Sequence, residues 1–284
     1  MASNPAGLTV LFGGGAPGST ALADTWELAS PGGSWQQLTS TAGTAPSGRT
    51  LAAMVWDPSL SKFVLFGGLN GTGFQGGTYA FDPTTMTWSE LTTTGSPTPR
   101  AGAALAALPD GEVLLFGGLG SSGFLSDTWV FDPATTTWSK QSGSGPTARY
   151  EAAMSAGPAG PVLFGGLGPS GLVGGTWAYN PADGTWSQAT TSGSSPSARY
   201  GAGFAYDVAA GDFVLFGGDT ASGYSSATYT YDPATAAWAT ISPTTSPSPR
   251  DGAGLTYDAT AHAFVLFGGW DGANFLSDTW ELAG

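Results

Sequence analysis

The triplet Phe-Gly-Gly recurs six times along the chain at nearly constant spacing, and this period constrains the fold more than any other feature. Successive copies are separated by 54, 50, 48, 52 and 51 residues. A period of about 20 to 50 residues is typical of repeat proteins, in which each unit is one supersecondary structure that packs on its neighbours. The triplets begin at Phe12, Phe66, Phe116, Phe164, Phe216 and Phe267.

Three further marks follow in a constant order. One is an aromatic residue after a threonine, the second is a lone tryptophan about nine residues later, and the third is an arginine after a loop rich in Pro, Ser and Thr. We therefore predict one repeat domain over residues 1–284, with repeats at about 1–40, 41–92, 93–142, 143–191, 192–242 and 243–284. The marks are Trp26, Tyr79, Trp129, Trp177, Tyr229 and Trp280, then Trp35, Trp88, Trp138, Trp186 and Trp238, then Arg49, Arg100, Arg149, Arg199 and Arg250.

Composition supports a folded domain and excludes several chemistries. The chain has 46 glycines and 20 prolines, a content that would indicate disorder if these residues did not recur periodically. They do recur, and 15 Phe, 11 Trp and 9 Tyr recur with them and can build a core. The chain has no Cys and one His, so we expect no disulfide, no metal cluster built on these residues and no cofactor. A net charge of −13 with seven Lys and Arg disfavours nucleic acids and anionic membranes as partners.

Each repeat predicts four short strands, A to D, joined by turns rich in Asp, Pro and Gly. In the fifth repeat strand A spans 201–206, strand B ends at Phe216, strand C spans 227–231 and strand D surrounds Trp238. No segment has a helical period, so the fold class is all-β. A four-stranded sheet buries both faces only by stacking on other sheets, so we predict a β-propeller of six four-stranded blades, the first and last incomplete.

The set of marks resembles the kelch repeat family over almost the whole chain. The residues that carry the resemblance are the Gly-Gly pair after strand B, the aromatic residue of strand C and the tryptophan of strand D. The resemblance implies a propeller with one blade per repeat, and usually a binding scaffold rather than an enzyme. The copper oxidase branch of the family needs a Cys-linked tyrosine and histidine ligands, which a chain without Cys and with one His does not have.

The two ends depart from the pattern. The first repeat starts at strand B, so we expect strand A to be missing there, with residues 1–7 resembling only the end of strand A and the following turn. The last repeat stops at strand C near Leu282, with no strand D. We expect an irregular junction, either a narrowed terminal blade patched by residues 1–7 or self-association of protomers through unpaired strands.

We expect the ligand on the loop face, which is the face built by the D–A and B–C loops. These loops are longer than the opposite turns and vary most between repeats. There the arginines form a basic centre suited to an anionic ligand, although a residue that recurs in every complete repeat has a structural role between loops and blades as its default explanation. An aspartate opens strand C in three repeats (Asp24, Asp127 and Asp278) and is expected to pair with some of the arginines.

Residues that break the repeat are further ligand-binding candidates. Glu151 is the lone carboxylate at a position near the axis that is otherwise small or apolar, and Trp270 follows the last Gly pair. Pairing of Glu151 with an arginine and packing of Trp270 between blades are the structural alternatives. The full candidate set is Arg49, Arg100, Arg149, Tyr150, Glu151, Arg199, Tyr200, Arg250, Asp251 and Trp270.

The sequence favours a non-catalytic binding or interaction scaffold, with no catalytic residue and no metal ligand assigned. The expected ligand is a protein segment or a glycan. Two alternatives stay open: an enzyme that uses carboxylates or a loosely bound divalent cation on the loop face, and a repeat fragment or engineered propeller without a ligand of its own.

Overall fold

The computed structural model describes residues 1–18, 21–39 and 43–283. The chain is all-β within these ranges and contains no helix that could span a membrane. The boundary expected between the first and second repeats, at residues 40 and 41, and the last residue of the sixth repeat lie outside the described residues.

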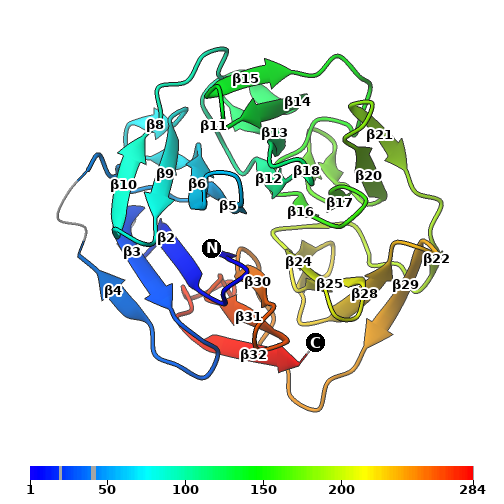
Figure 1. Ribbon diagram of the computed structural model, residues 1–284. Coiled ribbons are helices and arrows are strands. Elements are labelled where there is room, and N and C mark those ends of the chain that lie inside the picture. Colours follow the sequence, from blue (N-terminus) through cyan, green and yellow to red (C-terminus); the bar gives the residue numbers. More distant parts are fainter. Residues whose placement is uncertain (19–20, 40–42, 284) are drawn as a thin grey trace.

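Six larger sheets, each containing the phenylalanine of one Phe-Gly-Gly triplet, lie around a common centre (Figure 1). The first contains β1 (Ala2–Ser3), β2 (Thr9–Gly15), β3 (Ala21–Leu28) and β4 (Gln36–Leu38), and the second contains β5 (Ala53–Asp57), β6 (Lys62–Phe66), β9 (Thr78–Asp82) and β10 (Thr87–Glu90). The third contains β11 (Arg100–Ala101), β12 (Ala104–Ala107), β13 (Val113–Gly120), β14 (Gly123–Asp132) and β15 (Thr137–Lys140), and the fourth contains β16 (Ala153–Ser155), β17 (Val162–Phe164), β20 (Thr176–Asn180) and β21 (Thr185–Gln188). The fifth contains β22 (Ser192–Gly193), β24 (Gly203–Asp207), β25 (Asp212–Phe216), β28 (Thr228–Asp232) and β29 (Ala237–Ile241), and the sixth contains β30 (Gly254–Asp258), β31 (Ala263–Phe267) and β32 (Thr279–Ala283).

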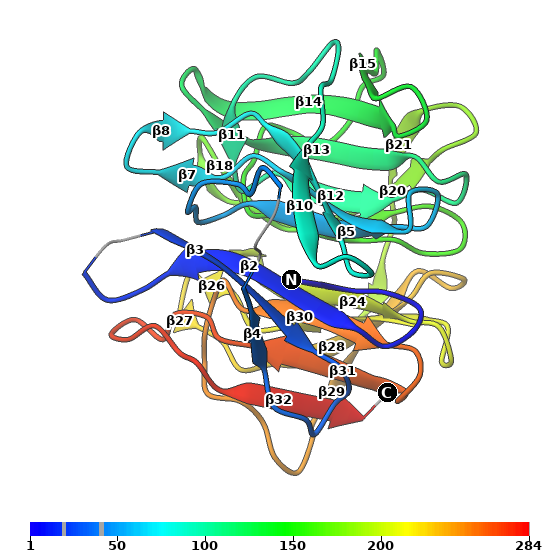
Figure 2. The ribbon, with the colours of Figure 1, turned by 60° about the vertical axis from the view of Figure 1, so that its left-hand side comes forward.

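Three small sheets are built on hairpins in the loops between the second and third main strands of a repeat, and one of them also includes a short strand that precedes the first main strand of its repeat. They pair β7 (Leu69–Asn70) with β8 (Gly73–Phe74), β18 (Leu167–Gly168) with β19 (Gly171–Leu172), and β26 (Asp219–Thr220) with both β23 (Arg199–Tyr200) and β27 (Gly223–Tyr224). Figure 2 shows the β7–β8 and β26–β27 hairpins projecting on the same side of the larger sheets, which is the loop face.

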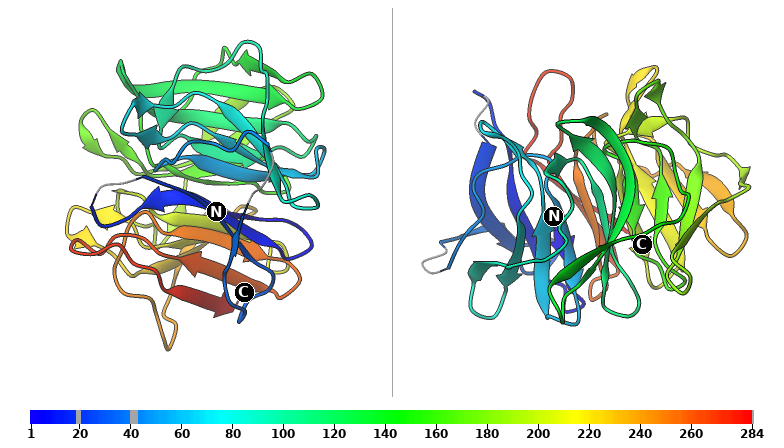
Figure 3. Two further views of the ribbon diagram at one scale, coloured as in Figure 1. Left: turned by 90° about the vertical axis from the view of Figure 1, so that its left-hand side faces the viewer. Right: turned by 90° about the horizontal axis from the view of Figure 1, so that it is seen from above.

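The inner strands correspond to the predicted strand A, and each contacts the next. The order of contact is β5, β12, β16, β24, β30 and β1, and β1 also contacts β5. Figures 1 and 3 agree that the blue sheet of the first repeat lies beside the orange and red sheet of the sixth. Each inner strand has neighbours on both sides, so small side chains suit this position. In the third repeat Ala101, Ala104 and Ala106 are all buried.

The Gly-Gly pair is required by the approach of the next repeat. Gly67 and Gly68 have φ of +73° and +107°, and a Cβ on Gly67 would lie 2.5 Å from the carbonyl oxygen of Arg100. The N–H of Gly68 donates a hydrogen bond to that same carbonyl (2.8 Å). A side chain at either position would strain the backbone or separate the two repeats.

The strand-D tryptophans join neighbouring repeats. The Trp138 indole N–H donates to Thr78 Oγ1 of the preceding repeat (3.0 Å), and its ring packs against Phe66 at 5.2 Å between centroids. The same bond is made by Trp88 to Thr25, by Trp186 to Thr128, by Trp238 to Thr176 and by Trp35 to Thr279. The last of these joins the first repeat to the sixth.

The regular recurrence of the strand-D tryptophan predicts a buried position for all five, and four of the five are buried. The exposed fractions of Trp88, Trp138, Trp186 and Trp238 are 1, 2, 9 and 2 %. Trp35 is only half-buried, because β4 is three residues long, its first two residues are exposed, and the Thr279 that Trp35 contacts is exposed as well.

The ends differ from the prediction in one respect. Strand A was expected to be missing from the first repeat, but residues Ala2 and Ser3 form β1 and pair with β2, so this repeat has four strands. The patch by residues 1–7 that the sequence allowed is therefore confirmed, and the absence of strand A is wrong. The sixth sheet has three strands, β30, β31 and β32, as expected from the missing strand D.

We expect Trp138→Ala to lower the free energy of unfolding by about 3–5 kcal/mol, because it empties a buried site and leaves Thr78 Oγ1 without its donor. Trp35→Ala should cost clearly less, because its ring is half-exposed. Urea unfolding followed by circular dichroism measures both, with the exposed His262→Ala as the control. Equal losses for Trp138 and Trp35 would contradict the different burial of the two rings.

Candidate functional site

All five arginines of the repeat occupy the same hydrogen-bonded position. In Arg149 the Nε–H donates to the Thr147 carbonyl (2.9 Å), Nη1 donates to the Gly165 carbonyl (2.8 Å) and Nη2 donates to Thr147 Oγ1 (3.0 Å). The arginine carbonyl accepts a bond from the second glycine of the preceding Gly-Gly pair, here Gly118 (2.9 Å). Each arginine therefore ties its own loop and its own sheet to the preceding repeat.

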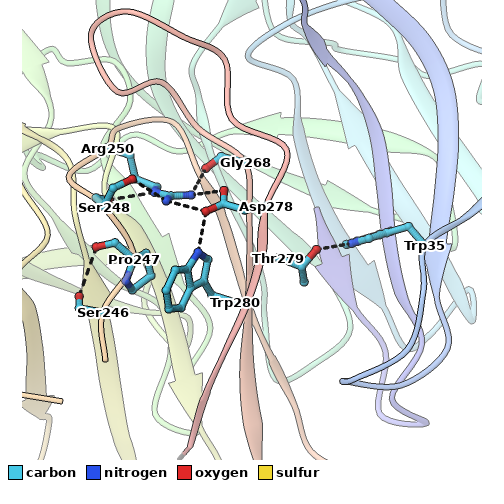
Figure 4. Close-up of polar contacts among 9 residues, drawn as sticks. All are labelled: Trp35, Ser246, Pro247, Ser248, Arg250, Gly268, Asp278, Thr279 and Trp280. Carbon is cyan, nitrogen blue, oxygen red and sulfur yellow. Dashed lines mark hydrogen bonds and ion pairs between the residues drawn. The ribbon is translucent and has the colours of Figure 1, made fainter. Parts of the chain in front are cut away.

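Two of the five arginines have a carboxylate partner, as the sequence predicted. Arg100 forms a bidentate pair with Asp127 (2.6 and 3.0 Å), and Arg250 forms one with Asp278 (2.6 and 2.9 Å; Figure 4). Burial opposes ionisation of Asp127, but hydrogen bonds from Arg100 and Trp129 hold the pKa of Asp127 below its usual value. The other guanidinium groups have no carboxylate partner among the described residues: Arg49 and Arg199 lie over Tyr79 and Tyr229.

These contacts remove the arginines from the surface. Their exposed fractions are between 0 and 2 %, and burial lowers the pKa of Arg149 to about 10. A basic centre for an anionic ligand requires guanidinium groups that the ligand can reach, and these donate to loop and sheet atoms instead. The structural role that the sequence left open is the one that the contacts support for Arg49, Arg100, Arg149, Arg199 and Arg250.

A chain of backbone hydrogen bonds runs around the centre of the loop face, two residues after each arginine. Here the N–H of one residue donates to the carbonyl of its counterpart in the preceding repeat, at 2.8 to 3.1 Å. Each residue has φ between +50° and +64°, a left-handed conformation that favours glycine. The chain comprises Leu51, Gly102, Glu151, Gly201 and Gly252.

Glu151 is the one charged residue in this chain. It is half-buried, with φ of +50°, and forms no ion pair and no side-chain hydrogen bond among the described residues. Its carboxylate lies near Asp251, because both side chains lie beside Gly201. A Cβ added to Gly201 would lie 3.2 Å from Glu151 Oε2 and 3.1 Å from Asp251 Cβ. Burial and, after it, the charge of Asp251 raise the pKa of Glu151 to about 8. Pairing with an arginine, the structural alternative for Glu151, is not found in the described part of the chain.

Asp251 and two tyrosines line the same region. Burial and, after it, the charge of Asp219 raise the pKa of Asp251 to about 6. Tyr150 and Tyr200 are stacked at 6.1 Å between ring centroids, and the Tyr200 hydroxyl donates to Asp219 Oδ2 (3.1 Å). Sequence reasoning missed Asp219 as a site residue, although an aspartate where three other repeats have leucine after the Gly pair was a visible signal.

Trp270 lies next to this cluster. It occupies the position of Asp219 in the sixth repeat and exchanges two backbone hydrogen bonds with Asp251 (2.9 and 3.1 Å). Its ring is half-buried against Phe275, at 4.8 Å between centroids. The axial cluster, as we define it, comprises Tyr150, Glu151, Tyr200, Asp219, Asp251 and Trp270.

Two cavities lie away from the loop face. One, of about 420 Å³, is lined by residues of all six inner strands, including Met54, Trp56 and Tyr257. The other, of about 300 Å³, is lined by Glu112, Asp132 and other residues of the third and fourth repeats. No group of three or more His, Asp or Glu side chains positioned to hold a metal ion occurs in the part of the chain that the structure describes.

The chain matches the family model of the KLHDC2/KLHL20/DRC7 Kelch-repeats domain over residues 6–166 and 159–283. These ranges span nearly the whole chain, so the chain belongs to the kelch-repeat family, and the resemblance inferred from the Gly-Gly, aromatic and tryptophan marks is confirmed. Kelch repeats in small antiparallel sheets fit a β-propeller. Kelch-repeat domains are typically non-enzymatic interaction scaffolds that commonly bind proteins.

We expect Arg100→Ala to lower the free energy of unfolding by about 3–5 kcal/mol, because it strands the carboxylate of Asp127, whose side chain is 17 % exposed. Arg149→Ala removes the same loop contacts without stranding an acid and should cost less, about 1–3 kcal/mol. Urea unfolding compares the two variants. A second change, Asp127→Ala, should restore part of the stability lost in Arg100→Ala and leave the loss in Arg149→Ala unchanged; failure of this rescue would contradict the role of the ion pair.

Proposed function

We propose that this chain is a protein-binding scaffold, folded as one closed six-bladed propeller over residues 1–284, whose axial cluster binds a cationic segment of a partner protein. The closed propeller is supported by the order of contacts among the inner strands, in which β1 touches both β30 and β5. The bond between Trp35 and Thr279 repeats, across the ends of the chain, the contact that joins the other repeats. The residues that line the 420 Å³ cavity come from all six inner strands.

Glu151 carries the proposal for the ligand site. At this position three other repeats have glycine, which adopts the left-handed backbone without strain, whereas a non-glycine residue there costs about 1 kcal/mol. The glutamate adds the cost of a half-buried carboxyl group without a partner. A residue that breaks two local rules in one place is typical of a binding or catalytic site.

The charge of the side chains that a ligand can contact indicates the charge of the ligand. Apart from the five buried arginines the chain has only Lys62 and Lys140, and Lys62 is paired with Asp82 (3.4 Å). The axial cluster contributes three carboxylates and three aromatic rings, which suit a lysine or arginine side chain through ion pairing and cation–π contact. The ligand proposed for the axial cluster is therefore cationic, in place of the anionic ligand expected from the sequence.

We expect oligolysine to bind in preference to oligoglutamate of equal length, and more tightly as the pH rises from 5 to 8. The cation binds the ionised acids, and the raised pKa values of Asp251 (about 6) and Glu151 (about 8) make that form scarce at low pH. Isothermal titration calorimetry measures the affinity and the protons released. Added salt should weaken binding.

Two double variants, each of which removes two acids, compare the contribution of the axial cluster to oligolysine binding with that of an acidic turn. Glu151→Gln with Asp251→Asn should weaken oligolysine binding at pH 8 at least about tenfold, the effect of losing charged hydrogen bonds. The double variant Asp110→Asn with Glu112→Gln, which removes two acids from a turn, should change the affinity for oligolysine little. A preference for oligoglutamate, or equal binding by the two double variants, would contradict the proposed site.

Glu151 also predicts a pH dependence of stability. Its pKa is about 8 in the folded chain against an ordinary 4.5, so the folded state binds the proton more tightly and stability falls as the pH rises between these values. Glu151→Gln cannot ionise and should therefore match the wild type near pH 4.5 and exceed it by about 1–3 kcal/mol at pH 9. This range is smaller than the full pKa shift implies, because the group is partly exposed. Urea unfolding at pH 4.5, 7 and 9 checks the trend, and a constant difference at all three would refute it.

A further inference from the structure

Each repeat contributes three successive residues, from or beside its inner strand, to the lining of the cavity of about 420 Å³. In the second repeat these residues are Met54, Val55 and Trp56, which end β5 on the side away from the loop face. Residues of the following turns, such as Val208 and Ala259, line the cavity as well. The cavity therefore lies toward the turn face, the face built by the A–B and C–D turns, and none of its described lining residues belongs to the axial cluster.

Three aromatic rings occupy the last of the three lining positions, which is the one nearest the turn face. They belong to Trp56, Tyr206 and Tyr257, and each packs against the phenylalanine that pairs with it across the sheet, at 4.9, 4.8 and 5.0 Å between ring centroids. All three rings are half-buried, so each is held on one side and keeps surface for a ligand. The other three repeats have small residues here, which are Ser3, Ala107 and Ala156.

The rest of the lining is largely apolar. Met54, Met154 and Leu255 line the level nearest the loop face, and the hydroxyls of Ser155 and Thr256 are among the few polar groups between this level and the rings. No side chain of Lys, Arg, His, Asp or Glu occurs among the described residues that line the cavity. Apolar and aromatic walls with a few hydroxyl groups are typical of sites for small organic molecules, and such sites range from about 300 to 1,000 Å³.

An aspartate directly follows each of the three aromatic residues, and all three aspartates are buried: Asp57, Asp207 and Asp258. Asp57 Oδ1 accepts hydrogen bonds from the N–H groups of Ser59 and Leu60 in the turn (2.9 and 3.1 Å), and Asp258 caps its own turn in the same way. The second oxygen, Oδ2, of both Asp57 and Asp258 is buried without a hydrogen-bond partner. A buried acid without a partner is costly, and a cation nearby lowers that cost.

The tyrosine hydroxyls at the cavity lie close to acids. Burial and, after it, a hydrogen bond to Asp207 raise the pKa of Tyr257 to about 12. Burial and, after it, the charges of Asp212 and Asp207 raise the pKa of Tyr206. Both hydroxyls therefore stay protonated at neutral pH, and the faces of the neutral rings remain available to a cation.

No Lys or Arg side chain in the described part of the chain compensates Asp57 or Asp258 by an ion pair. Lys62 pairs with Asp57 across β5 and β6 through the backbone, but its Nζ lies 3.4 Å from Asp82. Lys140 lies over the ring of Trp129, and the chain as a whole has a net charge of −13. This environment favours a positively charged ligand over a neutral or anionic one of the same shape.

We propose that the cavity binds a small organic cation with an apolar body, of the quaternary ammonium class. The cationic group lies at the level of Trp56, Tyr206 and Tyr257, whose ring faces attract it through cation–π contact. The apolar body extends toward Met54 and Met154, where it replaces water. The buried aspartates behind the rings add a longer-range attraction. The site is distinct from the axial cluster and takes a free small molecule rather than a segment of a partner protein.

Isothermal titration calorimetry with the full chain at pH 8 tests the ligand class. Choline should bind at least about fivefold more tightly than 3,3-dimethylbutan-1-ol, a neutral isostere in which carbon replaces the charged nitrogen. Benzyltrimethylammonium should bind more tightly than tetramethylammonium, because its apolar body fills more of the cavity. Saturating oligolysine at about 0.15 M salt, which screens distant charges, should leave the affinity for benzyltrimethylammonium unchanged.

Variants locate the bound cation. Trp56→Leu should weaken benzyltrimethylammonium binding about five- to tenfold, and Trp56→Phe should restore part of the loss because it keeps a ring. The matched control is Trp177→Leu, which removes a half-buried tryptophan that does not line the cavity and should change the affinity little. Ala156→Phe puts a ring where three other repeats have one, and it should weaken binding at least about tenfold by filling the cavity. Asp57→Asn keeps the turn acceptor Oδ1 and should weaken binding about threefold.

Melting temperatures show which variants are folded, and Ala156→Phe and Asp57→Asn test the site independently of Trp56. No binding of benzyltrimethylammonium at millimolar concentration, or binding of 3,3-dimethylbutan-1-ol as tight as that of choline, would overturn the proposal. Displacement by oligolysine would place the cation in the axial cluster and overturn it as well. Unchanged affinity in folded Ala156→Phe, or equal losses in Trp56→Leu and Trp177→Leu, would exclude the cavity as the site.

Discussion

The fold depends on a division of hydrogen-bonding groups between neighbouring repeats. Each of the first four repeats presents a threonine hydroxyl and a Gly-Gly N–H to the next one, and these are paired with an indole N–H and an arginine carbonyl that belong to that next repeat. Buried polar groups without partners are costly, so the stack is stable only when neighbours keep a fixed register. The arginine side chain satisfies further buried groups, because it donates hydrogen bonds to backbone carbonyls of its own loop and of its own sheet.

Much of this architecture follows from the sequence because the marks that carry it are repeated. Glycines with positive φ, tryptophans of strand D and arginines after a polar loop recur at one period, and a recurring residue is a scaffold residue first. The role of the five arginines shows the limit. Their type and position fit both a basic ligand site and a buried link, and only the burial of the guanidinium groups decides between them.

The rest could not be predicted because it depends on distances between repeats. Glu151 was visible as an exception, but the absence of an arginine partner and the approach of Asp251 arise from residues 100 positions apart. Asp219 acquires its importance through the hydroxyl of Tyr200, which donates to it, and through Asp251, whose pKa its charge raises. β1 was overlooked for a related reason: two residues are too few to show an alternating pattern, and their pairing with β2 defines the strand.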